Sequence, residues 1–452
     1  ASQRFPSTPL RDTARDIMQL CTMMARRVGR AAGAFGSQAI RTPSRPLATS
    51  PMQTLQEVQN YYGTVLQSSA DLKTNACTTG DRPPAVIRDA LAKVPQPIKD
   101  RYYGCGVSVP AGIAGLDVLD LGSGSGQDCY IAAQLVGSKG SVTGIDMTDE
   151  QLDVAREHAE AFTTETLGYP QNNLGLDPPP LSLSLLLLLL LLPGCPLRPP
   201  THLPTCAYEP FACCACRCPG RRFVKGFIED IAAAGVRPNS IDLCVSNCVI
   251  NLSPDKPSVI QGVYNALRDG GELYFSDVYA DRRLPEAVRQ HEVLWGECLA
   301  GALYVEDFKR ICHGVGFADP REVKRSPIEV TDPELLDLLG PVKFYSITYR
   351  CFKIPTLESL CEDYGQVAYY KGTIPGHPHT YSLDHGHVFE ANRPMLVCGN
   401  TASMVEESWL AEHFTVTGDR ATHFGLFDCG PAAAAVDGGV DGATEASGGG
   451  CC

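Results

Sequence analysis

A glycine-spaced loop between an apolar run and a helix-forming segment constrains the fold more than any other feature. Residues 118–126 read Val-Leu-Asp-Leu-Gly-Ser-Gly-Ser-Gly, and helix-forming side chains follow at 127–136. The pattern predicts a strand, a tight turn and a helix N-terminus, in that order. Because glycine lacks Cβ, the turn can adopt positive φ and let the backbone approach a ligand, which also meets the unsatisfied N–H groups of the helix start. The loop therefore predicts a site for a nucleotide-like cofactor.

A second strand with an acidic end follows this loop. Residues 141–147 read Ser-Val-Thr-Gly-Ile-Asp-Met, so Asp146 stands at the C-terminal end of the strand. An acidic residue roughly 20 positions beyond such a loop is placed to bind the hydroxyl pair of a ribose. Thr148 and Gln151 have the spacing of a capping box, which predicts the start of the next helix. Together these segments predict a β-α-β unit.

The alternation is interrupted by a segment of unusual composition at 175–221. It contains three consecutive prolines, a tract of eight leucines and six cysteines, and it shows no helical or strand periodicity. Without it, Leu174 would be followed directly by residues 222–228, which predict a third strand. We interpret the segment as a low-complexity insertion in a loop. Its cysteines are crowded and lack a second well-spaced ligand pair, so a metal site there is the weaker interpretation.

Beyond the insertion, strands and helices alternate again between 241 and 278. Such alternation indicates an α/β fold with a doubly wound, mainly parallel sheet that helices cover on both faces. Ligands bind at the carboxyl ends of the strands in these sheets. We therefore expect Gly122, Asp146, Phe227 and Cys248 to converge on one crevice.

Composition restricts the function. The chain has 452 residues and a formal net charge of −13, which disfavours nucleic-acid binding because that function needs a basic surface. No apolar run reaches the roughly 18 residues that a membrane span needs, so no membrane partner is expected. The 20 cysteines are spread over a chain with enzyme-like features, which indicates a reducing, cytoplasmic location rather than a disulfide framework.

The two ends of the chain differ in composition from the middle. Residues 1–52 are rich in arginine and serine and poor in acidic residues, as in an organellar transit peptide, although a disordered basic tail fits equally well. An organellar location follows only from the first interpretation. Residues 431–452 are rich in alanine and glycine, and we expect a disordered tail there.

The glycine spacing separates two cofactors that such a sheet can bind. Gly122, Gly124 and Gly126 depart from the G-x-G-x-x-G fingerprint of NAD-binding proteins, because the third glycine comes one residue early. An acidic residue two positions before the first glycine, here Asp120, resembles the methyltransferase form of the loop. Both features favour S-adenosylmethionine over NAD.

Four short motifs taken together resemble those of one family. They are Arg-Tyr-Tyr-Gly-Cys-Gly at 101–106, Leu-Asp-Leu-Gly-Ser-Gly-Ser-Gly at 119–126, Val-Ser-Asn-Cys-Val-Ile-Asn-Leu at 245–252 and Trp-Gly-Glu-Cys at 295–298. From about Leu55 to Asp419, apart from the insertion, the chain closely resembles the arsenite methyltransferase family. Many methyltransferases share the glycine loop, whereas three such cysteine contexts in one chain are far more specific.

The resemblance implies a fold and a reaction. The fold would be a Rossmann-like class I methyltransferase sheet with an antiparallel last strand, an appended arsenic-binding region and a small C-terminal α+β domain. The implied boundaries are 53–280 for the S-adenosylmethionine-binding domain, 281–350 for the arsenic-binding region and 351–430 for the C-terminal domain. The reaction would be in-line methyl transfer from S-adenosylmethionine to trivalent arsenic, supplied as arsenite or its thiol conjugates, in arsenic detoxification.

Cysteine is the residue type that this substrate requires, because arsenic(III) is soft and prefers thiolate ligands. By resemblance, Cys105, Cys248 and Cys298 bind arsenic(III), and Cys77 is a redox partner near Cys105. Methylation leaves arsenic pentavalent, so a dithiol must reduce it before another round. The resemblance implies thioredoxin or glutathione as the reductant.

The resemblance also assigns the cofactor site. The glycine loop would lie along the methionine part of the cofactor, Asp146 at the ribose, and Met147, Phe227 and Ile228 around the adenine. For Met147 and Ile228, packing in the core is an alternative. The complete set of expected cofactor-binding residues is Tyr103, Asp120, Gly122, Ser123, Gly124, Asp146, Met147, Phe227, Ile228 and Asn247.

Two other functions stay open on the sequence alone. One is S-adenosylmethionine-dependent methylation of a small organic molecule, which would usually need a carboxylate or histidine in the pocket as a base. The other is a non-catalytic, thiol-rich metalloid-binding protein with a degenerate cofactor fold. Arsenite binding that depends on Cys248 and Cys298 separates the first from the arsenic reaction.

Overall fold

The computed structural model describes residues 55–56, 58–59, 83–104, 106–170, 172–174, 223–291, 294–295, 298–330 and 332–428. The expectations for the leader, for Cys77 and Cys105, for the insertion at 175–221 and for the tail lie outside these ranges. Within them, no helix combines the length and the apolar character that crossing a bilayer requires.

The β-α-β unit forms around the glycine loop as predicted. β1 (Asp117–Leu121) leads into α5 (Gln127–Val136), and β2 (Ser141–Asp146) pairs with β1 in parallel. Gly126 is the N-cap of α5 and has a φ of 93°, a conformation that glycine adopts without steric cost. The local pattern of apolar residues and glycines was therefore sufficient to define this unit.

The unit belongs to an eight-stranded sheet with the order β3-β2-β1-β4-β5-β8-β7, in which β6 pairs with the end of β5. Neighbouring strands are parallel except at β8, which is antiparallel to both β5 and β7. This is the doubly wound arrangement with an antiparallel last strand that the resemblance implied, so the predicted fold class is confirmed. The other strands are β3 (Phe223–Lys225), β4 (Ile241–Asn247), β5 (Leu267–Ala280), β6 (Leu303–Tyr304), β7 (Arg321–Ile328) and β8 (Phe344–Phe352).

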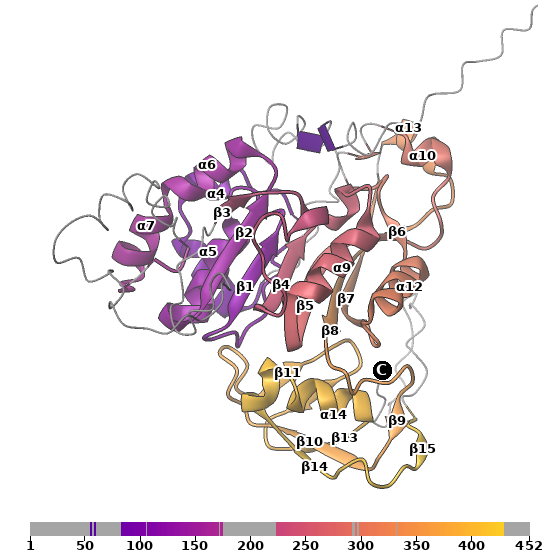
Figure 1. Ribbon diagram of the computed structural model, residues 1–452. Coiled ribbons are helices and arrows are strands. Elements are labelled where there is room, and N and C mark those ends of the chain that lie inside the picture. The colour runs from indigo at the N-terminus through magenta and orange to yellow at the C-terminus, as the bar shows by residue number, and fades with distance from the viewer. Residues whose placement is uncertain are drawn as a thin grey trace, which may run out of the picture. The chain divides into compact units, whose positions relative to one another are not determined.

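Helices cover both faces of this sheet (Figure 1). Val118 and Leu243 enter a core with α3, α5 and α6, whereas Leu119 and Cys244 enter a second core with α9 and α12. Adjacent residues of β1 and β4 thus pack into the two different cores on opposite faces of the sheet, because side chains alternate along a strand. The helices of this part are α3 (Ala85–Lys93), α4 (Gln96–Lys99), α6 (Asp149–Glu157), α7 (Ala159–Ala161), α9 (Lys256–Ala266), α10 (Glu286–Arg289), α12 (Val305–Val315) and α13 (Pro333–Leu339).

Two local predictions were wrong in detail. The strand predicted at 222–228 is confined to β3, because the chain turns after Gly226 into the 3-10 helix η5 (Ile228–Asp230). The helix predicted after Thr148 does begin at Asp149, but the Thr148 side chain does not cap it. The Thr148 hydroxyl donates a hydrogen bond to the Asp146 carboxylate instead. It therefore stabilises the residue at the end of β2 and does not cap the helix.

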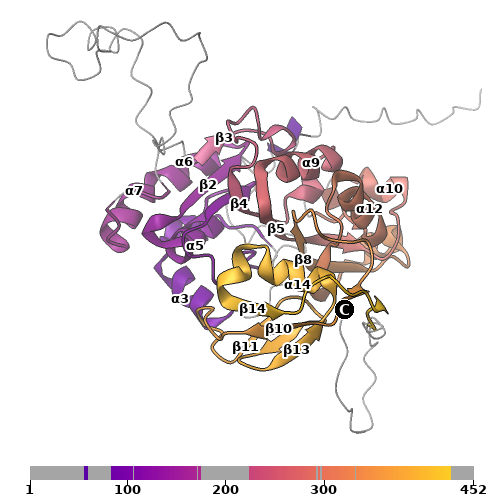
Figure 2. The same ribbon diagram turned by 60° about the horizontal axis from the view of Figure 1, so that its bottom comes forward.

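The residues after β8 form a small α+β part, as expected. A three-stranded antiparallel sheet with the order β13-β10-β14 packs against α14, and β11-β12 and β9-β15 form two-stranded sheets. This part lies next to β5 and β8 in both views (Figures 1 and 2). Its elements are β9 (Glu362–Asp363), β10 (Gln366–Tyr370), β11 (Thr380–Ser382), β12 (Val388–Glu390), β13 (Pro394–Val397), α14 (Gly399–Glu406), β14 (Phe414–Thr417) and β15 (Gly425–Leu426).

A buried ion pair joins this C-terminal part to the sheet. Arg350 of β8 and Glu272 of β5 form a bidentate pair, with N···O distances of 2.7 and 3.1 Å, and both side chains are almost fully buried. From the C-terminal part, Trp409 Nε1 donates to Glu272 at 2.8 Å, and the Leu383 carbonyl accepts from Arg350 at 2.7 Å. Because these partners satisfy both charged groups, the pair is retained without an unpaired buried charge.

Replacing one partner of this pair should destabilise the protein strongly. We expect Arg350→Met to lower the free energy of unfolding by about 3–5 kcal/mol, because Glu272 would be left buried without its counter-charge. Urea denaturation of the full chain measures the change. Arg393→Met removes an exposed pair with Glu390 and should change the same free energy by about 0.5 kcal/mol or less. Equal effects of the two substitutions would contradict the assignment.

Candidate active site

The glycine loop after β1 adopts a conformation that only glycine accepts at low cost. Gly122 and Gly124 have φ values of 64° and 52°. A Cβ at Gly122 would lie 2.3 Å from a methyl group of Val249, whereas a Cβ at Gly124 would meet no atom within 4 Å. Gly122 therefore permits close packing of the loop on the segment after β4, and Gly124 keeps the backbone accessible from the pocket.

Asp146 holds this loop to the end of β2. One carboxylate oxygen accepts the Gly124 N–H at 2.9 Å, and the other accepts the Thr148 N–H at 2.8 Å. Burial raises the pKa of Asp146, and these backbone hydrogen bonds oppose the shift because they favour the ionised form. The Thr148 hydroxyl also donates to this carboxylate, so several hydrogen bonds fix its orientation at the edge of the pocket.

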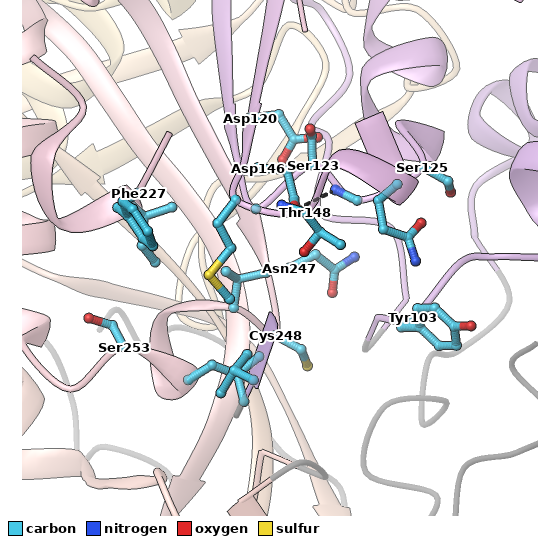
Figure 3. Close-up of a pocket in the computed structure, with 18 of the residues that line it drawn as sticks. Tyr103, Asp120, Ser123, Ser125, Asp146, Thr148, Phe227, Asn247, Cys248 and Ser253 are labelled. Atoms are coloured by element: carbon cyan, nitrogen blue, oxygen red, sulfur yellow. Dashed lines mark hydrogen bonds between the residues drawn. The ribbon is translucent and has the colours of Figure 1, made fainter. Parts of the chain in front are cut away.

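A pocket with about 920 Å³ of empty space, part of it open to solvent, lies at the carboxyl ends of β1, β2, β3 and β4. All ten residues expected to bind the cofactor line this pocket, and so does Cys248. Figure 3 shows Phe227 and Tyr103 on opposite sides, with Asn247 and Cys248 between them. The structure thus brings together the residues that the sequence placed at separate strand ends.

Several residues of this pocket were missed by the sequence reasoning. Some of these residues lie inside the quoted motifs but were not assigned to the cofactor, whereas others, such as Asp128 and Glu229, lie outside every motif. Glu229 could have been found, since it follows the third strand at the edge where ligands bind. The additional lining residues are Leu55, Val58, Arg101, Tyr102, Ser125, Asp128, Thr148, Gln151, Gly226, Glu229, Val249, Leu252 and Ser253.

Two buried carboxyl groups give the pocket an unusual electrostatic character. Burial raises the pKa of Asp120 well above its ordinary value, and repulsion from Asp128 raises it further. Burial raises the pKa of Asp128 to about 6, although a hydrogen bond from Asn247, 2.9 Å in length, opposes the shift. The pocket therefore carries less negative charge than its carboxyl groups would have in water, and it would gain charge if a cation entered.

Two of the predicted cysteines lie together beside this pocket. Cys248 follows β4 and lines the pocket, and Cys298 is buried directly behind it. The Cys298 Sγ donates to the Cys248 carbonyl oxygen at 3.1 Å. Cys248 is in a disulfide in this structure, so its thiolate forms only after reduction.

Both cysteines have backbone conformations that side chains rarely adopt. Cys248 has a φ of 55° and Cys298 a φ of 63°, and the described ranges contain only two other non-glycine residues with positive φ, both asparagine. Asparagine tolerates this region, whereas for most other residues it costs about 1–3 kcal/mol. Such strain persists only where the surroundings impose it and is concentrated at functional sites. The backbone at both cysteines is therefore held by its surroundings.

The third expected ligand, Cys105, and the redox partner, Cys77, lie outside the described residues. Among the residues that are described, no group of three or more His, Cys, Asp or Glu side chains is arranged to hold a metal ion. The described residues therefore place a pair of adjacent cysteines against a pocket built by a glycine loop, Asp146 and Asn247.

Comparison with known proteins agrees with this geometry. A profile described as a methyltransferase domain matches residues 114–167 and 220–316, and one described as an arsenite methyltransferase C-terminal domain matches residues 363–435. The arsenite methyltransferase of Aquipseudomonas alcaligenes is 46% identical over 83% of this chain and 94% of that protein. That of Homo sapiens is 38% identical over 80% of this chain and 83% of that protein.

A solved structure gives the same result. The crystal structure of an arsenic(III) S-adenosylmethionine methyltransferase from Chlamydomonas reinhardtii is 51% identical, covers 77% of this chain and 100% of that chain, and superimposes with a TM-score of 0.65. The chain therefore belongs to the arsenite methyltransferase family and is an S-adenosylmethionine-dependent methyltransferase.

Proposed function

We propose that the protein transfers a methyl group from S-adenosylmethionine to trivalent arsenic held by the thiolates of Cys105, Cys248 and Cys298, and that this reaction serves arsenic detoxification. The observation that carries the proposal is the position of Cys248, which lines the same pocket as the glycine loop and Asp146. Arsenic(III) is thiophilic, so a cysteine at the cofactor pocket, backed by a second cysteine, suits this substrate.

The pocket contains groups that fit a polar cofactor. Ser123 Oγ and Glu229 Oε2 are buried without a hydrogen-bond partner in the described part of the chain, and both residues line the pocket. Buried polar atoms are nearly always satisfied in proteins, so these two atoms indicate a ligand that supplies partners. We assign Ser123, with Gly122 and Gly124, to the methionine part, and Glu229 to the exocyclic amine of the adenine.

The other pocket residues complete this assignment. Asp146, which lines the pocket at the end of the second strand, would accept hydrogen bonds from the ribose hydroxyls. Phe227 is 42% exposed, which leaves the face of its ring available to the adenine beside Met147 and Ile228. Tyr103 and Asn247 would close the site near the reacting groups.

The protein contributes position rather than acid-base chemistry. The cofactor supplies an electrophilic methyl group on a positively charged sulfur. The cysteines would hold arsenic with its lone pair towards this methyl group, so that an As–C bond could form while the electron pair of the C–S bond leaves with the sulfur. Because a lone pair attacks, no side chain has to remove a proton, and holding the reactants in line lowers the barrier.

Arsenic leaves each methyl transfer in the pentavalent state, so another round needs two electrons. We propose that two thiols supply them by forming a disulfide in which Cys77 takes part, and that thioredoxin or glutathione reduces it. The disulfide at Cys248 is compatible with such a cycle, since a ligand thiolate must be regenerated before arsenic can bind again.

Loss of either described cysteine should abolish tight arsenite binding. The reduced wild-type chain should bind arsenite at a one-to-one ratio, and Cys248→Ser and Cys298→Ser should each weaken binding by about 100-fold, because one thiolate is lost from the coordination sphere. Equilibrium titration with arsenite measures the affinity. Cys361→Ser, in the C-terminal part, is the matched control and should bind as the wild type does. Wild-type affinity in both site variants would refute the ligand assignment.

Cofactor affinity should depend on the ionisation of Asp128. Because the folded-state pKa of about 6 lies above that of the unfolded chain, ionising this group costs stability as the pH rises from about 4 to 6. The positive sulfur of the cofactor offsets that cost, so affinity for S-adenosylmethionine should rise about tenfold between about pH 5 and pH 7. Calorimetric titration measures this step.

Matched variants isolate the Asp128 effect. Asp128→Asn should remove the pH step, whereas Asp153→Asn, at an exposed position on α6, should retain it. S-adenosylhomocysteine, whose sulfur is neutral, should show a smaller step. An affinity that falls with rising pH in the wild type would contradict this account.

A further inference from the structure

A lysine at the start of α9 lies between the two segments that carry the described cysteines. Lys256 Nζ donates to the Ser253 carbonyl oxygen at 2.9 Å, in the segment that follows Cys248. The same ammonium group lies 5.8 Å from the ring centroid of Trp295, three residues before Cys298. A cation over an indole ring is attracted by the ring quadrupole. Lys256 therefore contacts both cysteine segments.

A buried carboxyl group of β5 holds the segment that follows Cys248. Asp277, at the end of β5, is 1% exposed, and its Oδ2 accepts the Asn251 N–H at 3.0 Å. Cys248 N–H donates to the Ser276 carbonyl oxygen at 2.8 Å, so neighbouring residues of β5 hold both ends of the turn. A buried carboxylate needs a counter-charge. Burial raises the pKa of Asp277 to about 7, and attraction to the nearby Lys256 ammonium group is one of the interactions that oppose this shift.

The segment that carries Cys298 depends on Trp295. The Cys298 N–H donates to the Trp295 carbonyl oxygen at 3.1 Å, so these two residues form one turn. Immediately after it, a Cβ at Gly301 would lie 2.0 Å from the Asn251 carbonyl oxygen, which means that the two cysteine segments touch backbone to backbone. Trp295 and Cys298 therefore belong to one segment that packs directly on the segment after Cys248.

The surroundings of Lys256 leave it with a positive charge. Burial lowers its pKa to about 8, attraction to Asp277 opposes the shift, Arg289 lowers the pKa further, and Cys298 and Glu229 raise it. At neutral pH the ammonium group is therefore mostly protonated. The side chain is half-buried, so its interactions with the ring and the carboxylate are only weakly screened.

We propose that Lys256 is a positioning residue for the arsenic site, which links the segments of Cys248 and Cys298 and thereby fixes the separation and direction of their two sulfur atoms. This inference rests on the proposed function. The two cysteines occupy strained backbone conformations, and strain of this kind is retained only when the surroundings determine it. Two thiols held in place lose less freedom when arsenic binds, which strengthens binding of the metalloid and not of the cofactor.

Substitution of Lys256 tests this role in the reduced full chain. Lys256→Met keeps the length of the side chain and removes the charge, and we expect its dissociation constant for arsenite to rise about tenfold. The KM for arsenite should rise in parallel, while kcat at saturating arsenite and the dissociation constant for S-adenosylmethionine stay within about twofold, since the glycine loop and Asp146 are untouched.

Two further variants separate positioning from general destabilisation. Lys256→Arg keeps a cation that can stack on Trp295, and it should restore arsenite affinity to within about threefold of the wild type. Lys309→Met removes a lysine from an exposed pair with Glu306 on α12 and should alter neither affinity. A purely structural role would weaken both ligands together and would track the melting temperature.

The outcomes distinguish this inference from the proposed function. If the wild type binds arsenite and Cys248→Ser does not, the proposed function stands, and unchanged arsenite affinity in Lys256→Met overturns the role of Lys256 alone. Parallel loss of arsenite and S-adenosylmethionine binding in Lys256→Met also overturns it. If the wild type fails to bind arsenite, the proposed function and this inference both fail.

Discussion

The parallel pairing of β1 with β2 on one side and β4 on the other is the constraint on which the site depends. Leu121 is in register with Ile145 and with Ser246, so the glycine loop, Asp146 and Asn247 begin at the same edge of the sheet. The Ser123 N–H donates to the Ile145 carbonyl oxygen at 2.9 Å, which ties the loop to β2 just beyond the last paired residues. A cofactor site and a cysteine are thereby brought together although they are far apart in the sequence.

Strained backbone and buried carboxyl groups are found at this same edge of the sheet, at the carboxyl ends of the strands. Gly122 accommodates its neighbour Val249 because it has no side chain, whereas Cys248 and Cys298 reach similar φ values at a conformational cost. On the cofactor side, burial raises the pKa of Asp128 to about 6, so a cation in the pocket would favour its ionised form. The arrangement suits a reaction in which position, rather than proton transfer, supplies the rate.

The sequence predicted those parts of the fold that local patterns determine. β1, α5 and β2 follow from apolar alternation and glycine placement, and β4 begins the stretch from 241 to 278 in which strands and helices were expected to alternate. The predicted third strand was longer than β3, because no local signal marks the turn after Gly226. The pair of Arg350 and Glu272 could not be foreseen, since it joins strands that become neighbours only after folding. The ten expected cofactor residues line one pocket, but Glu229 and Asp128 lacked a motif. Positive φ at two cysteines has no sequence signature, and the roles of Cys77 and Cys105 stay predictions.

The most direct test of the account is product formation by the purified, reduced full chain supplied with arsenite, S-adenosylmethionine and a thiol reductant. Methylated arsenic should appear together with an equal amount of S-adenosylhomocysteine, and neither should form when Cys248 is replaced by serine. Consumption of S-adenosylmethionine on a small organic acceptor, with no methylated arsenic from arsenite, would contradict the account.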